Sequence, residues 1–163
     1  MKIAKQKKIK NPTSNYNKEL EAACLNNNLD SVKEILLSNQ SKKHKYAQDF
    51  LDDAVFAACM QGHLNIVKYL LESQELIINA DIYSYKSRSF KLLAMKNDTE
   101  IMEYLIFDYK IKKTPEIHSE CILRPKYEEM FKLKDNLESK IKMTKELEHH
   151  LPKNDVQSKK HKI

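Results

Sequence analysis

The chain has 163 residues, of which 41% are hydrophobic and 32% charged, and its net charge is +6. This length and composition allow one domain with a modest core and exclude a long disordered polymer. The single glycine and four prolines are too few for the turns of an all-β fold, so we predict helices joined by short polar links.

The positive charge lies at the two ends of the chain. Residues 1–10 carry +5 and residues 153–163 carry +3, so the body between them carries −2 of the net +6. A duplex-binding domain displays its basic residues on a folded face, so this distribution argues against nucleic-acid binding by the folded part.

We expect residues 1–14 and 152–163 to be disordered basic tails, because chain ends are usually loose. Each tail contains a K-K-x-K pattern, at residues 7–10 and 159–162. The alternative interpretation of these patterns is a nuclear-import signal or a contact with an acidic surface.

No membrane segment is predicted. The longest uncharged run, residues 54–67, is 14 residues long and contains polar side chains, whereas a spanning helix needs about 20 apolar residues. No apolar run follows the basic N-terminus, so we expect no secretory signal peptide. The three widely spaced cysteines, Cys24, Cys59 and Cys121, indicate free thiols in a reducing compartment such as the cytoplasm.

A repeat with an offset of 35 residues organises the middle of the chain. The tripeptide at residues 22–24 recurs at residues 57–59, and Ala94 occupies the place of Cys59 in a third copy. These small residues predict a first helix that lets its neighbours approach closely. A second helix is predicted by apolar residues at i, i+3 and i+4 spacing, namely Leu29, Val32, Ile35 and Leu36, then Leu64, Val67, Leu70 and Leu71, then Ile101, Met102, Leu105 and Ile106.

The turn between the two helices supports the repeat independently. A tight helix–helix link needs a residue that tolerates positive φ, which glycine does best and asparagine second best. Gly62 is the only glycine of the chain and lies at this turn, and Asn27 and Asn97 occupy the same place in the other copies. We therefore predict helix–turn–helix units near residues 18–39, 53–74 and 88–109, with these three residues shaping the turns.

After the third unit the pattern changes. Thr114 and Pro115 form a good helix start, and Pro125 ends that short helix. A longer helix is predicted to run to residue 151, with apolar residues at helical spacing: Met130, Leu133, Leu137, Ile141, Leu147 and Leu151. We predict a helical cap over residues 114–151, which can be described as a degenerate fourth repeat. The alternative is that the end of the long helix projects and pairs with a partner helix.

Residues 61–71, with the sequence QGHLNIVKYLL, resemble the core of an ankyrin repeat, whose helix pair follows A-A-x-x-G-H-x-x-I-V-x-x-L-L. The resemblance extends from about Leu20 to Phe107. The family's T-P-L-H segment is reduced to one buried apolar position, and residues 78–80 resemble its strand-like V-N-A entry to a hairpin. The resemblance implies an all-α ankyrin-repeat solenoid of about three repeats with a helical cap, and we expect a monomer. His63 falls on the family's G-H position and is expected to set the turn.

Ankyrin proteins generally bind partners with the exposed side of their first helices and with their loops, on the concave face. Carried over to this chain, these positions include Phe50, Asp52, Met60, Gln61, Tyr83, Tyr85, Arg88, Met95 and Lys96. Tyrosine, methionine and arginine are enriched at interface cores, so Tyr83, Tyr85, Met60 and Met95 are the predicted anchors. The alternative for Phe50 and one of the tyrosines is packing beneath the loops.

No catalytic motif is recognisable. The chain has no phosphate-binding glycine loop, no G-x-S-x-G and no H-E-x-x-H. Cys24 and Cys59 are expected to be packing residues. The only candidate metal ligands, His118, Cys121, His149 and His150, match no common zinc spacing. We therefore expect that the protein is not an enzyme and that it binds no metal, no cofactor and no small-molecule substrate.

The predicted function is protein binding. A small ankyrin protein rich in lysine and asparagine resembles those of bacteria that live inside host cells and of some large viruses, which suggests an effector delivered into a host cell. The alternative is an inhibitor or immunity-type protein that blocks a cognate toxin or enzyme within its own cell. A third hypothesis is nucleic-acid association through the basic tails, with a steep dependence on salt.

Overall fold

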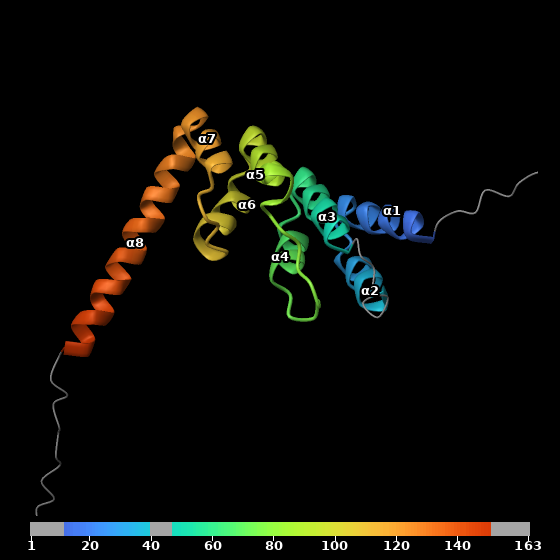
Figure 1. Ribbon diagram of the computed structural model, residues 1–163, viewed down its shortest axis with the longest axis horizontal. Coiled ribbons are helices and arrows are strands. Elements are labelled where there is room, and N and C mark those ends of the chain that lie inside the picture. Colours follow the sequence, from blue (N-terminus) through green and yellow to red (C-terminus); the bar gives the residue numbers. More distant parts are fainter. Residues whose placement is uncertain (1–11, 40–46, 151–163) are drawn as a thin grey trace, which may run out of the picture.

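The computed structural model describes residues 12–39 and 47–150, and these residues form helices joined by short links (Figure 1). No strand occurs in the described ranges, so the all-α prediction is confirmed. The elements are α1 (Pro12–Leu25), α2 (Leu29–Asn39), α3 (Ala47–Gln61), α4 (Leu64–Glu72), α5 (Ser84–Lys96), α6 (Thr99–Glu103), the π-helical turn η1 (Tyr104–Asp108), α7 (Pro115–Leu123) and α8 (Pro125–His150).

The helices form a two-layered stack. The first helices α1, α3, α5 and α7 pack side by side in that order, and Figure 1 shows them as one row. The second helices form the other layer, in which α2 packs on α4, α4 on α6, and η1 on the beginning of α8. Each pair of helices contacts mainly its neighbours along the chain, which is the arrangement of a solenoid.

Pairs of buried residues four positions apart hold the first helices together. One buried apolar residue is followed by a small one, as in Leu20 with Cys24 and Val55 with Cys59, and the same pattern continues as Phe90 with Ala94 and Ile117 with Cys121. The small member permits close approach of the neighbouring helix. Because α7 carries the same pair, α7 and α8 form a degenerate fourth unit of the stack.

The second helices bury the apolar stripe that their spacing predicts. In α2 the residues Val32 and Leu36 are buried, and in α4 all four described core positions from Ile66 to Leu71 are buried. In the third unit α6 continues into a π-helical turn, and Tyr109 donates its backbone N–H to the carbonyl of Tyr104 at 2.9 Å. This wider turn keeps the apolar residues of the third copy inside the core.

The turns between first and second helices are left-handed at their predicted positions. The φ angles of Asn27, Gly62 and Asn97 are 56°, 79° and 55°. Neighbouring turns also contact each other, because His63 donates from Nε2 to the carbonyl of Leu25 at 3.1 Å. A Cβ added at Gly62 would lie 3.3 Å from Oδ2 of Asp98, which caps α6.

Gly62→Ala is therefore expected to lower the free energy of unfolding by about 1–2 kcal/mol, because alanine is strained at positive φ and its Cβ crowds Asp98. Urea denaturation followed by circular dichroism measures the change. Asn27→Gly is the matched control, since it relaxes the same backbone conformation and should change stability by less than about 0.5 kcal/mol. Equal stability of Gly62→Ala and the wild type would contradict the role given to this turn.

The first helices begin earlier than the sequence pattern suggests. Helix α1 starts at Pro12, α3 at Ala47 and α5 at Ser84, each ahead of the predicted unit boundary. Residues 12–14 thus belong to α1 and not to the expected basic tail. Proline suits the first helical position because its missing N–H is not needed there. The remainder of the two predicted tails lies outside the described residues.

The link between α4 and α5 has no strand, although residues 78–80 resemble a hairpin entry. Its main anchor is the backbone N–H of Ala80, which donates to the carbonyl of Leu70 at 2.8 Å. Ala80 and Ile82 are buried, whereas Ile77 and Ile78 are exposed. The link therefore reaches back over the end of α4 before α5 begins.

Candidate protein-binding surface

A row of apolar side chains follows the outer side of the first helices, near the turns. It consists of Leu25, Met60, Met95 and Ile122, each of which directly follows the small buried residue of its helix. We call these four residues the apolar row. Leu25 and Met60 are half-buried, whereas Met95 is 71% and Ile122 66% exposed. The row thus becomes more exposed toward the C-terminal end of the stack.

Further side chains extend the row toward the turns. Leu123, directly after Ile122, is 71% exposed, and Gln61 and Lys96 occupy the corresponding exposed places on α3 and α5. Lys96 donates from Nζ to the carbonyl of Met60 and so joins the ends of these two helices. Large exposed apolar side chains beside polar ones are typical of protein-binding surfaces.

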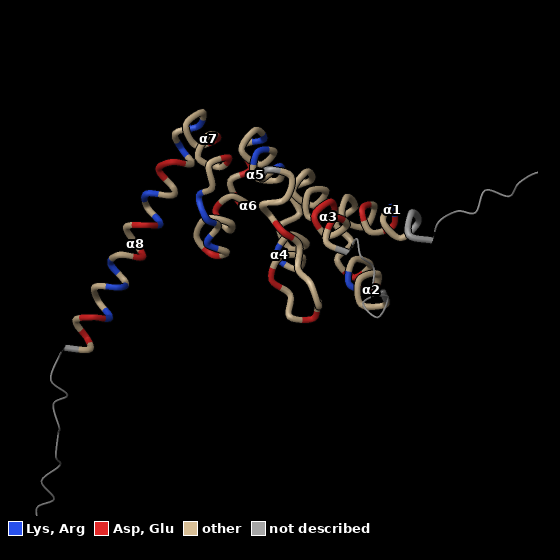
Figure 2. Tube along the Cα trace, in the orientation of Figure 1, with Lys and Arg blue, Asp and Glu red and all other residues tan. Residues whose placement is uncertain are grey.

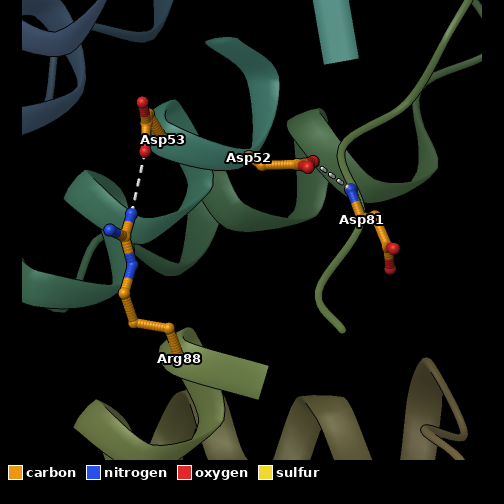
Figure 3. A network of polar contacts seen from close by, with 4 residues as sticks. All are labelled: Asp52, Asp53, Asp81 and Arg88. Atoms are coloured by element: carbon orange, nitrogen blue, oxygen red, sulfur yellow. Dashed lines mark hydrogen bonds and ion pairs between the residues drawn. The ribbon is translucent and has the colours of Figure 1, made fainter. Parts of the chain in front are cut away.

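An aromatic and ionic cluster joins the middle of α3 to the N-terminal end of α5. Nη2 of Arg88 lies 2.8 Å from Oδ1 of Asp53, an ion pair between equivalent repeat positions that Figure 3 shows. The guanidinium also lies 3.7 Å from the ring centre of Phe56 and 4.9 Å from that of Tyr85. Arg88 is thereby held over two rings, and Tyr85 remains more than half exposed.

The backbone around this cluster is strained. Tyr85 and Ser87 have positive φ values of 48° and 58°, which non-glycine residues rarely adopt. The negative charge of Asp53 raises the pKa of Tyr85 above its ordinary value. Figure 2 shows acidic residues on α3 close to basic residues on α5, so this end of the surface presents both signs of charge.

Asp52 does not belong to the exposed surface, contrary to the prediction from the sequence. Its side chain is 4% exposed, and Oδ1 accepts the backbone N–H of Asp81 at 2.7 Å (Figure 3). The same oxygen accepts a hydrogen bond from Nε2 of Gln48 at 2.8 Å, and Nε2 also donates to the carbonyl of Asn79 at 3.1 Å. Asp52 thereby fastens the α4–α5 link onto α3, since its buried carboxylate accepts hydrogen bonds from both segments.

Tyr83 also differs from its predicted role as an anchor. It packs partly against the core, and its hydroxyl accepts the backbone N–H of Lys112 at 2.6 Å. The side chain joins the α4–α5 link to the segment before α7. Phe50 is partly buried on the first turn of α3. Met60 and Met95, with Gln61 and Lys96 after them, thus occupy equivalent places on α3 and α5. Arg88 packs on Tyr85, whereas Asp52 and Tyr83 hold the α4–α5 link.

Ile122 and Leu123 are the surface residues that the sequence analysis missed. The sequence analysis describes residues 114–151 as a cap or degenerate fourth repeat, but it carries no surface position over into this segment. The signal was available in the spacing of Ile117 and Cys121, which repeats that of Val55 and Cys59. Applying this spacing would have placed Ile122 in line with Met60.

The three cysteines are packing residues. Burial raises the pKa of the Cys24 and Cys59 thiols to about 12, and that of Cys121 to about 11. A thiol with such a pKa is protonated at neutral pH and is a poor nucleophile. Within the described residues, no group of three or more histidine, cysteine or acidic side chains could hold a metal ion.

Comparison with known proteins supports the repeat. A family model for three copies of the ankyrin repeat matches residues 20–116, more than half of the chain. Searches of curated proteins and of solved structures found no match. Among the described residues, no helix is long and apolar enough to cross a membrane. With its 35-residue period, its left-handed turns and this match, the chain belongs to the ankyrin-repeat family.

Proposed function

We propose that this protein binds one other protein through the apolar row and the Arg88 cluster, and that it acts by occupying its partner's surface. Ankyrin repeats are generally protein–protein interaction modules. The observation that carries the proposal is the alignment of Met95, Ile122 and Leu123, each about two-thirds or more exposed, on one side of the stack. Solvating such side chains is unfavourable, and a partner that covers them gains hydrophobic free energy.

The partner's surface is expected to offer an apolar ridge or pocket flanked by polar groups of both signs. Methionine adapts its shape to an irregular partner, and Tyr85 above Arg88 supplies a rigid aromatic contact. This chemistry favours binding over catalysis, and it supports the view that the protein is not an enzyme. Delivery into a host cell as an effector and inhibition of a cognate toxin are the two settings proposed for this binding.

The experiment is affinity capture from a lysate, followed by titration of the identified partner. Met95→Glu combined with Ile122→Glu is expected to weaken binding by at least tenfold, because it places two charges inside the apolar contact. Circular dichroism should show unchanged helix content, since both side chains are exposed.

Leu37→Glu on α2 is the matched control, because Leu37 is an exposed apolar residue of the other layer. It should leave the affinity unchanged. Loss of binding in the control but not in the Met95/Ile122 variant would place the interface elsewhere. A captured host protein indicates an effector, and a captured toxin indicates an inhibitor. Binding that disappears with salt and with removal of residues 1–12 and 153–163 would instead support nucleic-acid association.

A further inference from the structure

Helix α8 is only partly covered by the stack. Tyr127 and Phe131 on its first turns are buried, and Phe90 lies with its ring centre 6.3 Å from that of Tyr127. Beyond these turns the helix extends away from the stack (Figure 1), and its large apolar side chains are exposed by 44–66%: Leu133, Leu137, Ile141, Met143 and Leu147. The beginning of the helix therefore docks, and the remainder projects.

Four of these exposed residues form one stripe. At 100° per residue, Leu133, Leu137, Ile141 and Leu147 fall within an arc of roughly 120° that borders the face carrying Tyr127. Leu133, Leu137 and Leu147 occupy the a and d positions of a heptad pattern, and Ile141 lies beside them at an e position. This spacing of apolar residues is typical of a helix that packs against another helix.

Charged residues beside the stripe would meet opposite charges if two copies of α8 packed antiparallel. Figure 2 shows basic and acidic residues alternating along α8. In an antiparallel pair in which Leu137 faces Leu147, Lys134 and Glu148 of the other helix both occupy e positions and flank the apolar core on the same side. Glu138 lies outside the stripe, where its Oε1 is 3.9 Å from Nζ of Lys110 of the same chain. Two-fold symmetry makes the contact between Lys134 and Glu148 twice.

A parallel pair lacks this complementarity. In parallel register Lys140, at a d position, would lie opposite its own copy in the core of the pair. The antiparallel arrangement instead sets Lys140 opposite Thr144 and Leu137 opposite Leu147. It also places the two stacks at opposite ends of the helix pair, which leaves room for both.

We propose that the exposed part of α8 pairs antiparallel with the same helix of a second copy, centred near Ile141. This dimer replaces the monomer expected from the sequence. It leaves the apolar row free on both copies, so one dimer would present two binding surfaces and could gain avidity for a clustered partner. The proposal is independent of the function proposed above, because it involves a different surface.

The first test is the mass of the full-length protein in solution, measured by sedimentation equilibrium over a range of concentrations. The wild type is expected to be a dimer that dissociates on dilution, and Leu137→Glu a monomer under the same conditions. Because Leu137 is exposed, the variant should keep its helix content and its unfolding temperature. Met95→Glu, on the apolar row, is the control and should remain dimeric. A monomeric wild type, or a dimer that is insensitive to Leu137→Glu, would overturn the proposal.

Charge reversal tests the antiparallel arrangement. Glu148→Lys is expected to weaken dimerisation about tenfold, since it creates two repulsive contacts with Lys134. Lys134→Glu should act in the same direction, although Lys134 also reaches the carbonyl of Ile111 at 3.4 Å. Combining the two substitutions restores opposite charges and should recover the wild-type affinity. A double variant as weak as the single ones would rule out this pairing.

Discussion

Replacing Phe90 with alanine is expected to lower the free energy of unfolding by about 3–5 kcal/mol, the largest effect among the substitutions considered. Phe90 is fully buried in α5, where it stacks edge-on against Tyr127 and lies with its ring centre 6.5 Å from that of Phe131. It therefore joins the third repeat to the helix pair that caps the stack. Removing the ring leaves a cavity between α5 and α8, at the end of the stack where only α7 and α8 cover the core.

Urea denaturation followed by circular dichroism measures this loss. Met95→Ala on the same helix is the control, and it should change stability by no more than about 0.5 kcal/mol because Met95 is mostly exposed. Hydrogen exchange should show the start of α8 losing protection first, since Phe90 makes ring contacts with Tyr127 and Phe131 there. A Phe90→Ala variant within 1 kcal/mol of the wild type would contradict this account of the cap.

Asp52→Ala is expected to destabilise the protein by about 2–3 kcal/mol. The substitution removes the acceptor for the backbone N–H of Asp81 and for the amide of Gln48, and hydrogen bonds to a charged acceptor contribute more than neutral ones. The α4–α5 link should loosen first, because Asp52 and Gln48 hold it onto α3. Chemical denaturation gives the global loss, and hydrogen exchange at Asp81 reports the local one.

The neighbouring aspartate provides the control. Asp53 pairs with Arg88 across 2.8 Å, but both side chains are about half exposed, so Asp53→Ala should cost no more than about 1 kcal/mol. Asp52→Asn keeps an oxygen that can accept the backbone N–H of Asp81. Its free energy of unfolding should therefore lie between those of the two alanine variants. If Asp52→Ala and Asp53→Ala were equally stable, the buried carboxylate would not be what fastens the link.

The pattern of apolar and small residues determined the repeat. A period of 35 residues, with one stripe per second helix and one small pair per first helix, allows only helices that pack in two layers. Gly62, Asn27 and Asn97 marked the turns because few residues tolerate positive φ. These are local properties, since helical periodicity and backbone preference are readable within one segment of the chain.

Only the tertiary structure decided which polar and aromatic side chains are exposed and which are covered by other segments. Asp52 and Asp53 are adjacent and chemically identical, yet one is buried beneath the α4–α5 link and the other pairs at the surface with Arg88. Tyr83 likewise supports the segment before α7 and does not face outward. Helix α8 follows one apolar pattern along its length, but the stack covers only its first turns. Burial of a side chain depends on which distant segments lie over it, and that information is not local to the sequence around the residue.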